Sequence, residues 1–383
     1  MRRLFWLVAA VVLVDTMFFA AVAPLLPHYS DELDLSKTGA GILTAAYPAG
    51  TFIGALPSGW LATRWGVKPT LLLGLSMLGL SSLGFAFAHT VVLLDTARFI
   101  QGVGGACMWA AGMAWLVSAT PVARRGEVIG AALSAAIVGV LLGPVLGGLA
   151  TLLSPKAVFS AVTVVAAGLA TWAWTMPAPE QDESPGMRVM LRALGRPAVL
   201  LGFWVFTLPA LFAGVVEVLV PLRLDDLGVA GATIGVVFLV SAAIEAVVSP
   251  IAGRFSDRAG RMAPIRTGLI GAAVMAVLLP LPHTALLVAV TVTLAFVALA
   301  SFWAPGMAML SDAAEAHGLD QALAFAISNL AWALGHVLGA GVGGAVADAT
   351  SDTVPYAALA VLCAVTLAGL SLSRRRTAAE VGA

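Results

Sequence analysis

Four acidic residues of this sequence lie in hydrophobic stretches, where an ionisable group is costly. Asp15 stands in the middle of the apolar run 4–26, which is long enough to cross a lipid bilayer. A carboxylate at the centre of a bilayer costs about 2.5–3.5 kcal/mol on insertion scales. We therefore expect Asp15 to face a protein cavity, where it takes up a proton or pairs with a cation. A structural ion pair with another helix is the alternative that the sequence leaves open.

The other three acids belong to the second half of the chain. Glu217 lies in the run FAGVVEVLVPL, Glu245 lies in VSAAIEAVVSP, and Asp312 ends WAPGMAMLSD. Acids inside membrane spans usually mark substrate pathways or proton relays. We expect Glu217 near an external vestibule, Glu245 at the greatest depth and Asp312 near the cytoplasmic end. For Asp312, a solvated helix terminus is the alternative.

Several other residues within hydrophobic spans are candidates for a binding or proton-coupling site. Arg98 carries a charge that needs a partner or water, so it is either part of a proton-coupling network or a structural ion pair. Asn329 could hydrogen-bond a substrate, whereas His336 is expected to be a packing residue, with a proton relay as the alternative. Some mid-helix tryptophans could present a ring face to a cation, although most such residues serve packing: Trp109, Trp303 and Trp332.

The composition identifies the elements that must position these groups. The 383 residues are 60% hydrophobic and 10% charged, with a mean hydropathy of +1.00, whereas a soluble chain carries about 25% charged residues. We therefore expect a polytopic protein in a lipid bilayer. The net charge of zero suggests no nucleic-acid partner. The sequence shows no metal-ligand cluster, no cofactor motif and no nucleophile–His–acid spacing, so an enzyme is not expected.

The hydrophobic segments predict an all-α membrane protein with 12 transmembrane helices in two pseudo-symmetric bundles of six. The longest polar stretch divides the chain into an N-terminal bundle (1–176), a cytoplasmic linker (177–196) and a C-terminal bundle (197–383). Basic residues are far more frequent on one side of the predicted spans than on the other, which places both termini in the cytoplasm. The expected spans are 4–27, 38–62, 69–88, 92–118, 127–151, 157–175, 197–222, 229–254, 263–281, 284–311, 319–347 and 354–373.

Two motifs of the first half recur in the second half. The glycine- and arginine-containing loop 59–68 returns at 253–261, and the small-residue pattern 139–148 returns at 335–344, at offsets of 194 and 196 residues. Both copies of each motif fall on the same side of the membrane, so the repeat is parallel. Parallel six-helix halves with a site at the midplane between them are a known plan of transporters.

The repeated motifs predict how the helices approach one another. Glycines in the two loops permit tight turns, and the basic residues can engage helix ends, which would suit a latch between conformations. The alternative is that the basic residues of these loops only reflect the excess of Lys and Arg on the cytoplasmic side of a membrane protein. In the fifth predicted helix, Gly143 belongs to a smooth packing face and Pro144 bends the helix. The expected gating residues in the loops are Gly59, Arg64, Gly66, Gly253, Asp257 and Arg258.

The loop motif resembles the signature of the major facilitator superfamily, and the resemblance covers essentially the whole chain. The first copy departs from the family pattern, because Thr63 stands where an acid is usual, while Asp257 keeps the acid in the second copy. The glycine pattern around Pro144 is similar to the antiporter signature of the family's drug/proton exchangers. Arg98 resembles the arginine of the family's fourth helix, which implies that it takes part in proton coupling.

Within the superfamily, the chain resembles the vesicular amine transporters and their bacterial drug-exporting relatives. The likeness rests on the segment that starts at Asp15, on Glu217 and on Asp312. It implies that Asp15 contacts a substrate amine, Glu217 helps to bind it and Asp312 is tied to protonation. Two positions depart from the family, because Asn329 replaces an acid and Tyr47 replaces a lysine.

We therefore expect a proton-coupled antiporter of a bacterial inner membrane that exports small amphipathic, cationic compounds by alternating access. Its partners would be a small-molecule substrate, protons and the lipid bilayer, and we expect a monomer. A uniporter or a proton symporter of a neutral nutrient such as a sugar is the main alternative. A membrane enzyme or an interaction scaffold is a further alternative that the sequence disfavours.

Overall fold

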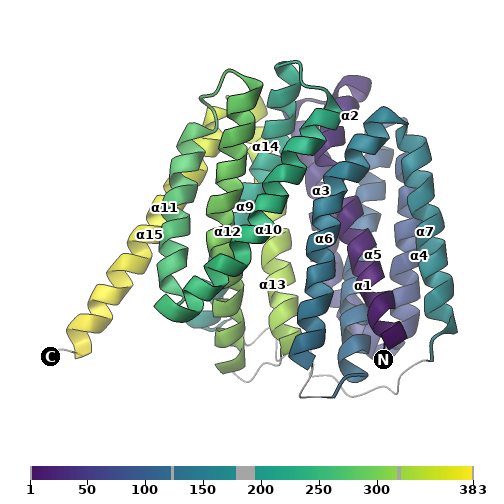
Figure 1. Cartoon of the computed structure of the whole chain (residues 1–383), viewed down its shortest axis with the longest axis horizontal. Helices are drawn as coiled ribbons and strands as arrows, with labels where there is room; N and C mark the ends of the chain where they lie inside the picture. The colour runs from purple at the N-terminus through teal and green to yellow at the C-terminus, as the bar shows by residue number, and fades with distance from the viewer. Residues whose placement is uncertain (1, 122–124, 178–194, 317–320, 382–383) are drawn as a thin grey trace.

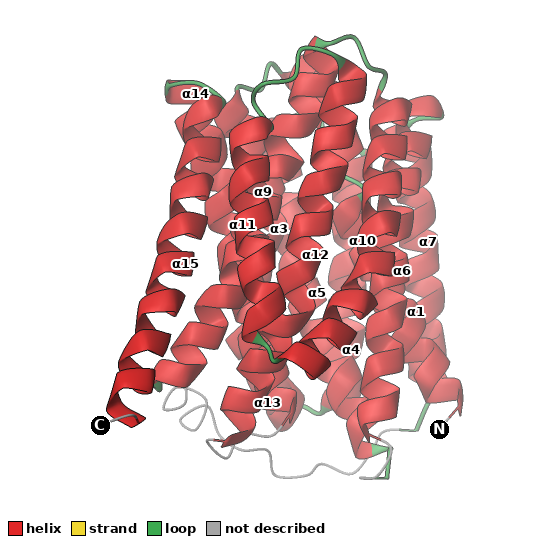
Figure 2. Ribbon diagram, turned by 60° about the vertical axis from the view of Figure 1, so that its left-hand side comes forward, coloured by secondary structure: helices red, strands yellow, loops and turns green. Residues whose placement is uncertain are grey.

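The computed structural model describes residues 2–121, 125–177, 195–316 and 321–381, and these residues form helices without any strand (Figure 1, Figure 2). Several of the helices begin with a side-chain cap. The Ser36 hydroxyl accepts a hydrogen bond from the Gly39 amide, and Ser154 and Thr90 cap two further helices. The first half contains α1 (Arg2–Ala20), η1 (Ala23–Leu25), α2 (Leu26–Leu33), α3 (Lys37–Arg64), α4 (Val67–Ala86), α5 (Val91–Ser118), α6 (Arg125–Leu152) and α7 (Pro155–Thr175).

The second half repeats this order of long helices. Its eleventh predicted span is interrupted by a π-helical segment, η3, between two α-helical pieces. The elements are α9 (Pro197–Asp226), α10 (Gly231–Ala259), α11 (Met262–Leu278), α12 (Ala285–Ala316), α13 (Gln321–His336), η3 (Val337–Val342), α14 (Gly343–Ala349) and α15 (Thr353–Val381).

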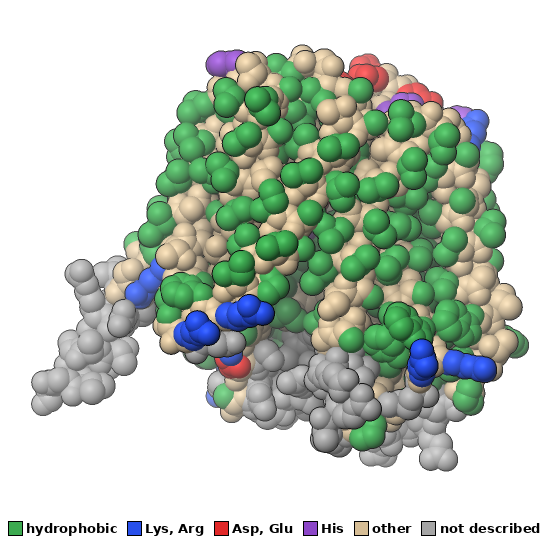
Figure 3. All heavy atoms as spheres, in the orientation of Figure 1, with side chains coloured by type: hydrophobic (Ala, Val, Ile, Leu, Met, Phe, Trp, Pro, Cys, Tyr) green, Lys and Arg blue, Asp and Glu red, His purple; other side chains and the backbone are tan. Residues whose placement is uncertain are grey.

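The lengths and composition of these helices suit a bilayer. Within the described residues, 11 helical segments are long and apolar enough to cross a membrane. The remaining span, α11, has 17 residues, which is at the lower limit for crossing. It ends at Leu278, before the predicted end at 281, because Pro280 and Pro282 do not favour continuing a helix. Hydrophobic side chains cover the flank of the molecule (Figure 3). The protein is a multi-pass membrane protein, as predicted.

The helices form two bundles, α1–α7 and α9–α15, that lie side by side (Figure 1). They meet along two seams, where α3 packs against α13, η3 and α14, and where α6 packs against α10. Both chain ends lie at the same end of the molecule, which we call the termini face. We call the end that holds Lys37 and Asp352 the opposite face. Most of the predicted linker 177–196 lies outside the described residues.

The sequence repeat has a counterpart in the backbone. Gly66 follows α3 with a φ of 97°, and Gly260 follows α10 with a φ of 81°. A residue with a Cβ rarely adopts such a positive φ, so glycine is required at both turns. The two loops therefore turn in the same way in the two bundles.

The repeated small residues bring helices into close contact. A Cβ on Gly139 of α6 would lie 2.4 Å from the Leu13 carbonyl oxygen of α1. In the second copy, a Cβ on Gly335 of α13 would lie 2.4 Å from the Thr207 carbonyl oxygen of α9. Both distances are impossible for a real side chain, so each glycine allows backbones to touch. The smooth face therefore holds α6 against α1 and α13 against α9.

The two bundles are closed against each other at the opposite face. A Cβ on Gly41 of α3 would lie 2.4 Å from the carbonyl oxygen of Ala340 in η3. The Thr38 hydroxyl donates a 2.6 Å hydrogen bond to Asp348, and Lys37 forms an ion pair with Asp352. Backbone contact and polar pairs thus join α3 to the end of the α13–α14 span.

Candidate functional site

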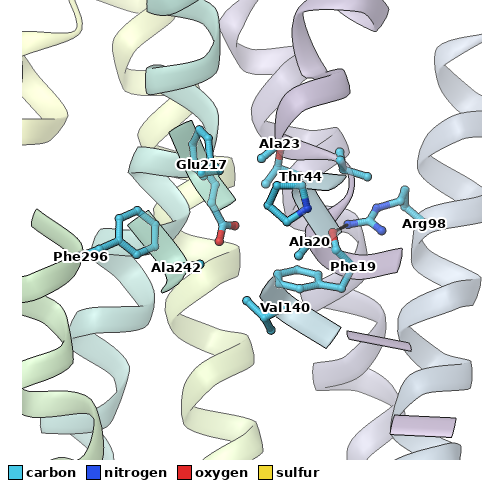
Figure 4. A pocket seen from close by; sticks show the side chains of 12 residues that line it. Phe19, Ala20, Ala23, Thr44, Arg98, Val140, Glu217, Ala242 and Phe296 are labelled. Carbon is cyan, nitrogen blue, oxygen red and sulfur yellow. Dashed lines mark hydrogen bonds between the residues drawn. The ribbon is translucent and has the colours of Figure 1, made fainter. Parts of the chain in front are cut away.

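A cavity lies between the two bundles and is lined from both sides (Figure 4). Most of its wall is apolar. The polar side chains in the wall are those of Thr44, Arg98 and Glu217, and Arg98 and Glu217 approach the cavity from opposite bundles. The apolar part of the lining comprises Phe19, Ala20, Val22, Ala23, Val140, Pro144, Phe238, Ala242 and Phe296. An apolar wall with a few placed polar groups is typical of a small-molecule site.

Asp15 lies in the interior of the first bundle and not in the cavity wall. Its side chain is fully buried, and its Oδ2 accepts hydrogen bonds from the Tyr47 hydroxyl (2.9 Å) and the Trp109 indole nitrogen (3.1 Å). Gly105 of α5 supports this arrangement, because a Cβ there would lie 2.7 Å from the Tyr47 hydroxyl oxygen. The Oδ1 atom is buried without a hydrogen-bond partner in the described part of the chain. Asp15 therefore faces protein rather than lipid, but it does not line the cavity.

Arg98 is a buried cation that also lines the cavity. Its Nη1 donates to Gln101 Oε1 over 2.6 Å, and its Nη2 donates to the Phe19 carbonyl oxygen over 3.4 Å. The guanidinium carbon lies 5.2 Å from the ring centre of Tyr47 and 5.8 Å from that of Phe19. Aromatic faces attract a cation, with about 2 kcal/mol or more when the pair is desolvated. Tyr47 therefore contacts both Asp15, through its hydroxyl, and Arg98, through its ring.

Glu217 reaches the cavity from α9, where it lies beside a buried histidine. Its Oε1 is 3.7 Å from Nε2 of His336, whose side chain is 3% exposed. The imidazole stacks on Trp332 with ring centres 4.4 Å apart. Trp332 in turn meets the edge of Phe19 from the first bundle. The carboxylate and imidazole of the second bundle therefore face the aromatic wall of the first.

The remaining predicted substrate and proton residues are spread through the second bundle. Glu245 of α10 is half-buried and lies within electrostatic range of Glu217. Asp312 is exposed near the termini face, where Arg261 pairs with it over 3.1 Å. Asn329 is half-buried on α13, and Trp303 packs its ring on Phe206. The structure thus brings Glu217 to the cavity and places Asp312 at the protein surface.

The predicted gating residues fall into two groups. Gly143 packs α6 against α1, since a Cβ there would meet Ala20, whereas the carbonyl oxygen of Pro144 lies against Gly235 of α10 in the seam between the bundles. Gly59 and Gly253, in contrast, have open space where a Cβ would stand. Gly66 makes the positive-φ turn described above.

The charged loop residues are only partly described. Arg64 lies over the ring of Trp60 at 5.7 Å, and Arg258 is exposed. The side chains of Thr63 and Asp257 lie outside the described residues. Lys68 donates hydrogen bonds to the carbonyl oxygens of Trp174 and Met176, and so caps the end of α7. A basic residue of the first loop therefore does engage a helix end.

Sequence reasoning missed several residues of this site. Phe19, Thr44 and Gln101 contribute a wall, a polar group and a hydrogen-bond acceptor, and none of them stands out in an apolar span. His336 was expected mainly to pack, and Tyr47 was noted only as a departure from a family pattern. An available signal was that His336 is an ionisable residue within a membrane span, where such residues are rare.

The chain is similar to known transporters. The sequence model of the Major Facilitator Superfamily matches residues 8–224 and 210–382. "Multidrug resistance protein 1" of Bacillus subtilis is 25% identical over 375 residues, which cover 93% of this chain and 95% of that protein. The human "Synaptic vesicular amine transporter" is 26% identical over 300 residues, 76% of this chain but 58% of that protein. This chain therefore matches less than two thirds of the amine transporter.

Solved structures share the fold. A bacterial homologue of the human lysosomal transporter Spinster superposes with a TM-score of 0.81 at 14% sequence identity, over 97% of this chain and 96% of that one. Three observations support the same assignment: the two pseudo-symmetric bundles, the cavity between them and the match along nearly the whole sequence. The chain belongs to the Major Facilitator Superfamily, and it is therefore a membrane transporter and not an enzyme.

Proposed function

We propose that the protein is a proton-coupled antiporter that exports small amphipathic, cationic compounds by alternating access. The observation that carries this proposal is Glu217, a carboxylate in the wall of an otherwise mostly apolar cavity between the two bundles. An apolar wall suits the body of an amphipathic molecule, and a carboxylate suits its positive charge. The names of the relatives, a multidrug resistance protein and an amine transporter, are in keeping with such a substrate.

The mechanism that we propose is competition between a cation and protons for buried carboxylates. Glu217 meets the substrate in the cavity, while Asp15, which is hydrogen-bonded to Tyr47 inside the first bundle, takes part in proton exchange. Tyr47 touches both Asp15 and Arg98, so a change at either charge alters the surroundings of the other. The inward proton gradient then drives export, because substrate and proton do not occupy the acids together.

We also propose that the termini face is cytoplasmic and that the protein resides in a cell membrane as a monomer. The bias of Lys and Arg toward this face supports the orientation. The backbone contact of Gly41 with Ala340 closes the opposite face. In this orientation the described conformation is closed toward the outside.

Transport in proteoliposomes tests this function. Purified protein is reconstituted, a pH gradient is imposed, and the movement of tetraphenylphosphonium is followed with and without a protonophore. We expect the probe to be taken up against its own concentration gradient, and we expect this uptake to stop when the protonophore is added. The Glu217→Gln variant should reduce the uptake by at least about tenfold. Probe movement that ignores the pH gradient would count against proton coupling. Transport of a neutral sugar instead would replace the substrate assignment.

A further inference from the structure

His336 is a buried imidazole that the proposed function does not yet use. Its Nδ1 lies 3.2 Å from the carbonyl oxygen of Trp332, one turn earlier in α13. Its Nε2 lies 3.7 Å from Glu217 Oε1. The ring is also held between the stacked Trp332 and the edge of Phe19. Both ring nitrogens therefore face oxygen atoms in a setting that restricts ring rotation.

These two contacts limit where the protons can be. A carbonyl oxygen can only accept a hydrogen bond, so the contact with Trp332 places a proton on Nδ1 of His336. In the neutral ring, Nε2 then carries a lone pair. An ionised Glu217 also offers only lone pairs, and two acceptors that face each other repel. A proton on either Nε2 of His336 or the carboxyl group of Glu217 removes this conflict.

We propose that Glu217 and His336 form a proton-binding pair, which holds one proton between its two side chains and releases it when a substrate cation binds at Glu217. This inference rests on the proposed function and adds a proton site in the second bundle. With the proton, the pair has no net charge, since it is either imidazolium with carboxylate or imidazole with carboxylic acid. Without the proton it carries one negative charge, which the substrate cation balances. The released proton passes to water in the cavity.

Among the charged neighbours of the pair, Arg98 favours exchange over joint binding. Arg98 on α5 lies within electrostatic range of Glu217 from the other bundle, and Glu245 does so from α10. Asp15 and Tyr47 of the first bundle lie beyond Phe19, and Asp312 of α12 is paired with Arg261 at the termini face. The fixed positive charge of Arg98 opposes a proton and a cation together at the pair. One therefore replaces the other.

Nitrogen NMR on full-length protein labelled with ¹⁵N-histidine tests the pair without any substrate. His336→Gln assigns the signal, and His28→Gln is the matched control, because His28 also faces a carboxylate, Glu32, but at an exposed site. We expect His336 at neutral pH to be either an imidazolium or an Nδ1–H ring that accepts a proton from Glu217. In the Glu217→Gln variant, the imidazole of His336 should be neutral. Its NMR signal should then no longer change when tetraphenylphosphonium is added. A neutral ring with its proton on Nε2 in the unsubstituted protein would overturn the proposal.

A second measurement asks whether the pair exchanges its proton for a cation. Tetraphenylphosphonium is added to detergent-purified protein in weak buffer, and a pH dye records released protons while probe binding is measured separately. We expect His336→Gln to lower the protons released per bound probe by roughly half or more, and His28→Gln to leave them unchanged. Equal release from His336→Gln and unsubstituted protein would refute the exchange role. If the probe does not bind at all, the proposed substrate class fails, while the NMR result still decides whether the pair holds a proton.

Discussion

The hydroxyl of Tyr47 donates a 2.9 Å hydrogen bond to Asp15, and the ring of the same side chain packs against Phe19, which lines the cavity. The ring of Tyr47 also faces the guanidinium of Arg98 at 5.2 Å. One aromatic residue on α3 therefore contacts an acid from α1 and a base from α5. Substitutions of Tyr47 can separate its polar role from its packing role.

Tyr47→Phe should retain the ring over Arg98 and lose the hydrogen bond to Asp15. We expect a loss of about 1.5–3 kcal/mol of stability, the usual value of a hydrogen bond to a charged group. Tyr47→Ala should be worse, because it also removes the buried ring, and should cost about 3–5 kcal/mol as other large aromatic truncations do. Thermal unfolding of the two variants in detergent measures both effects. Equal stability of the two variants would show that the ring contributes nothing.

Gly105→Ala should disturb the surroundings of Asp15 without changing any polar group. The added methyl would lie 2.7 Å from the Tyr47 hydroxyl oxygen and 3.1 Å from Asp15 Oδ1. Overpacking of this kind costs about 1–3 kcal/mol, so we expect a lower unfolding temperature and weaker proton-coupled transport. Gly168→Ala on α7 is the matched control, since the position of its Cβ is open, and it should leave both measurements unchanged. If the Gly105→Ala variant keeps the unfolding temperature and the proton-coupled transport of the unsubstituted protein, Tyr47 and Asp15 can move apart at no cost.

Gly41→Ala should open the opposite face. Its methyl would lie 2.4 Å from the Ala340 carbonyl oxygen, so the two bundles must separate there. About 1–3 kcal/mol of overpacking corresponds to a shift of roughly 5- to 150-fold in the balance of conformations. The readout is disulfide formation in a protein with Thr38→Cys and Asp348→Cys, whose side chains are hydrogen-bonded in the closed state.

We expect cross-linking between these two cysteines to fall in the Gly41→Ala background. Gly59→Ala serves as the control, because its Cβ would stand in open space. Cross-linking that is as fast with Gly41→Ala as with the control would show that the seam adapts without opening.

Asp312→Asn should affect transport much less than Glu217→Gln does. Asp312 is 59% exposed, and its surface ion pair with Arg261 is worth about 0–1 kcal/mol. Glu217 lines the cavity, so its charge is available to a substrate. In the proteoliposome assay we expect Asp312→Asn to stay within about twofold of the unsubstituted rate, whereas Glu217→Gln loses at least about tenfold. If Asp312→Asn abolishes coupling, the role implied by the amine-transporter resemblance holds, and Asp312 must leave Arg261 during the cycle.

Much of the fold could be predicted from local features of the chain. The long apolar runs indicated the spans, since a bilayer accepts only helices of that length and composition. The positions of Gly66 and Gly260 in the repeated loop indicated two equivalent turns, because a positive φ favours glycine wherever it occurs. The small-residue pattern around Gly139 likewise predicted close helix packing. Each of these features depends on neighbours in sequence.

The site depended on contacts that no local pattern contains. The sequence identified Asp15, Arg98 and Glu217 as unusual charges, but not which of them meets the cavity. That outcome was set by helix packing, because Asp15 lies inside the first bundle, where Tyr47 from another helix binds it, while Glu217 lies in the cavity wall.

His336 illustrates the same limit. From its sequence alone it is a polar residue on an apolar helix, and packing is the usual role of such a residue. Its position opposite Glu217 arises because Gly335 and Gly339 bring α13 against α9, a relation between residues more than 100 positions apart. Sequence alone therefore determined the spans, the repeat and the presence of buried charge. The tertiary structure decided which charges face one another, because that depends on how the helices rotate and pack.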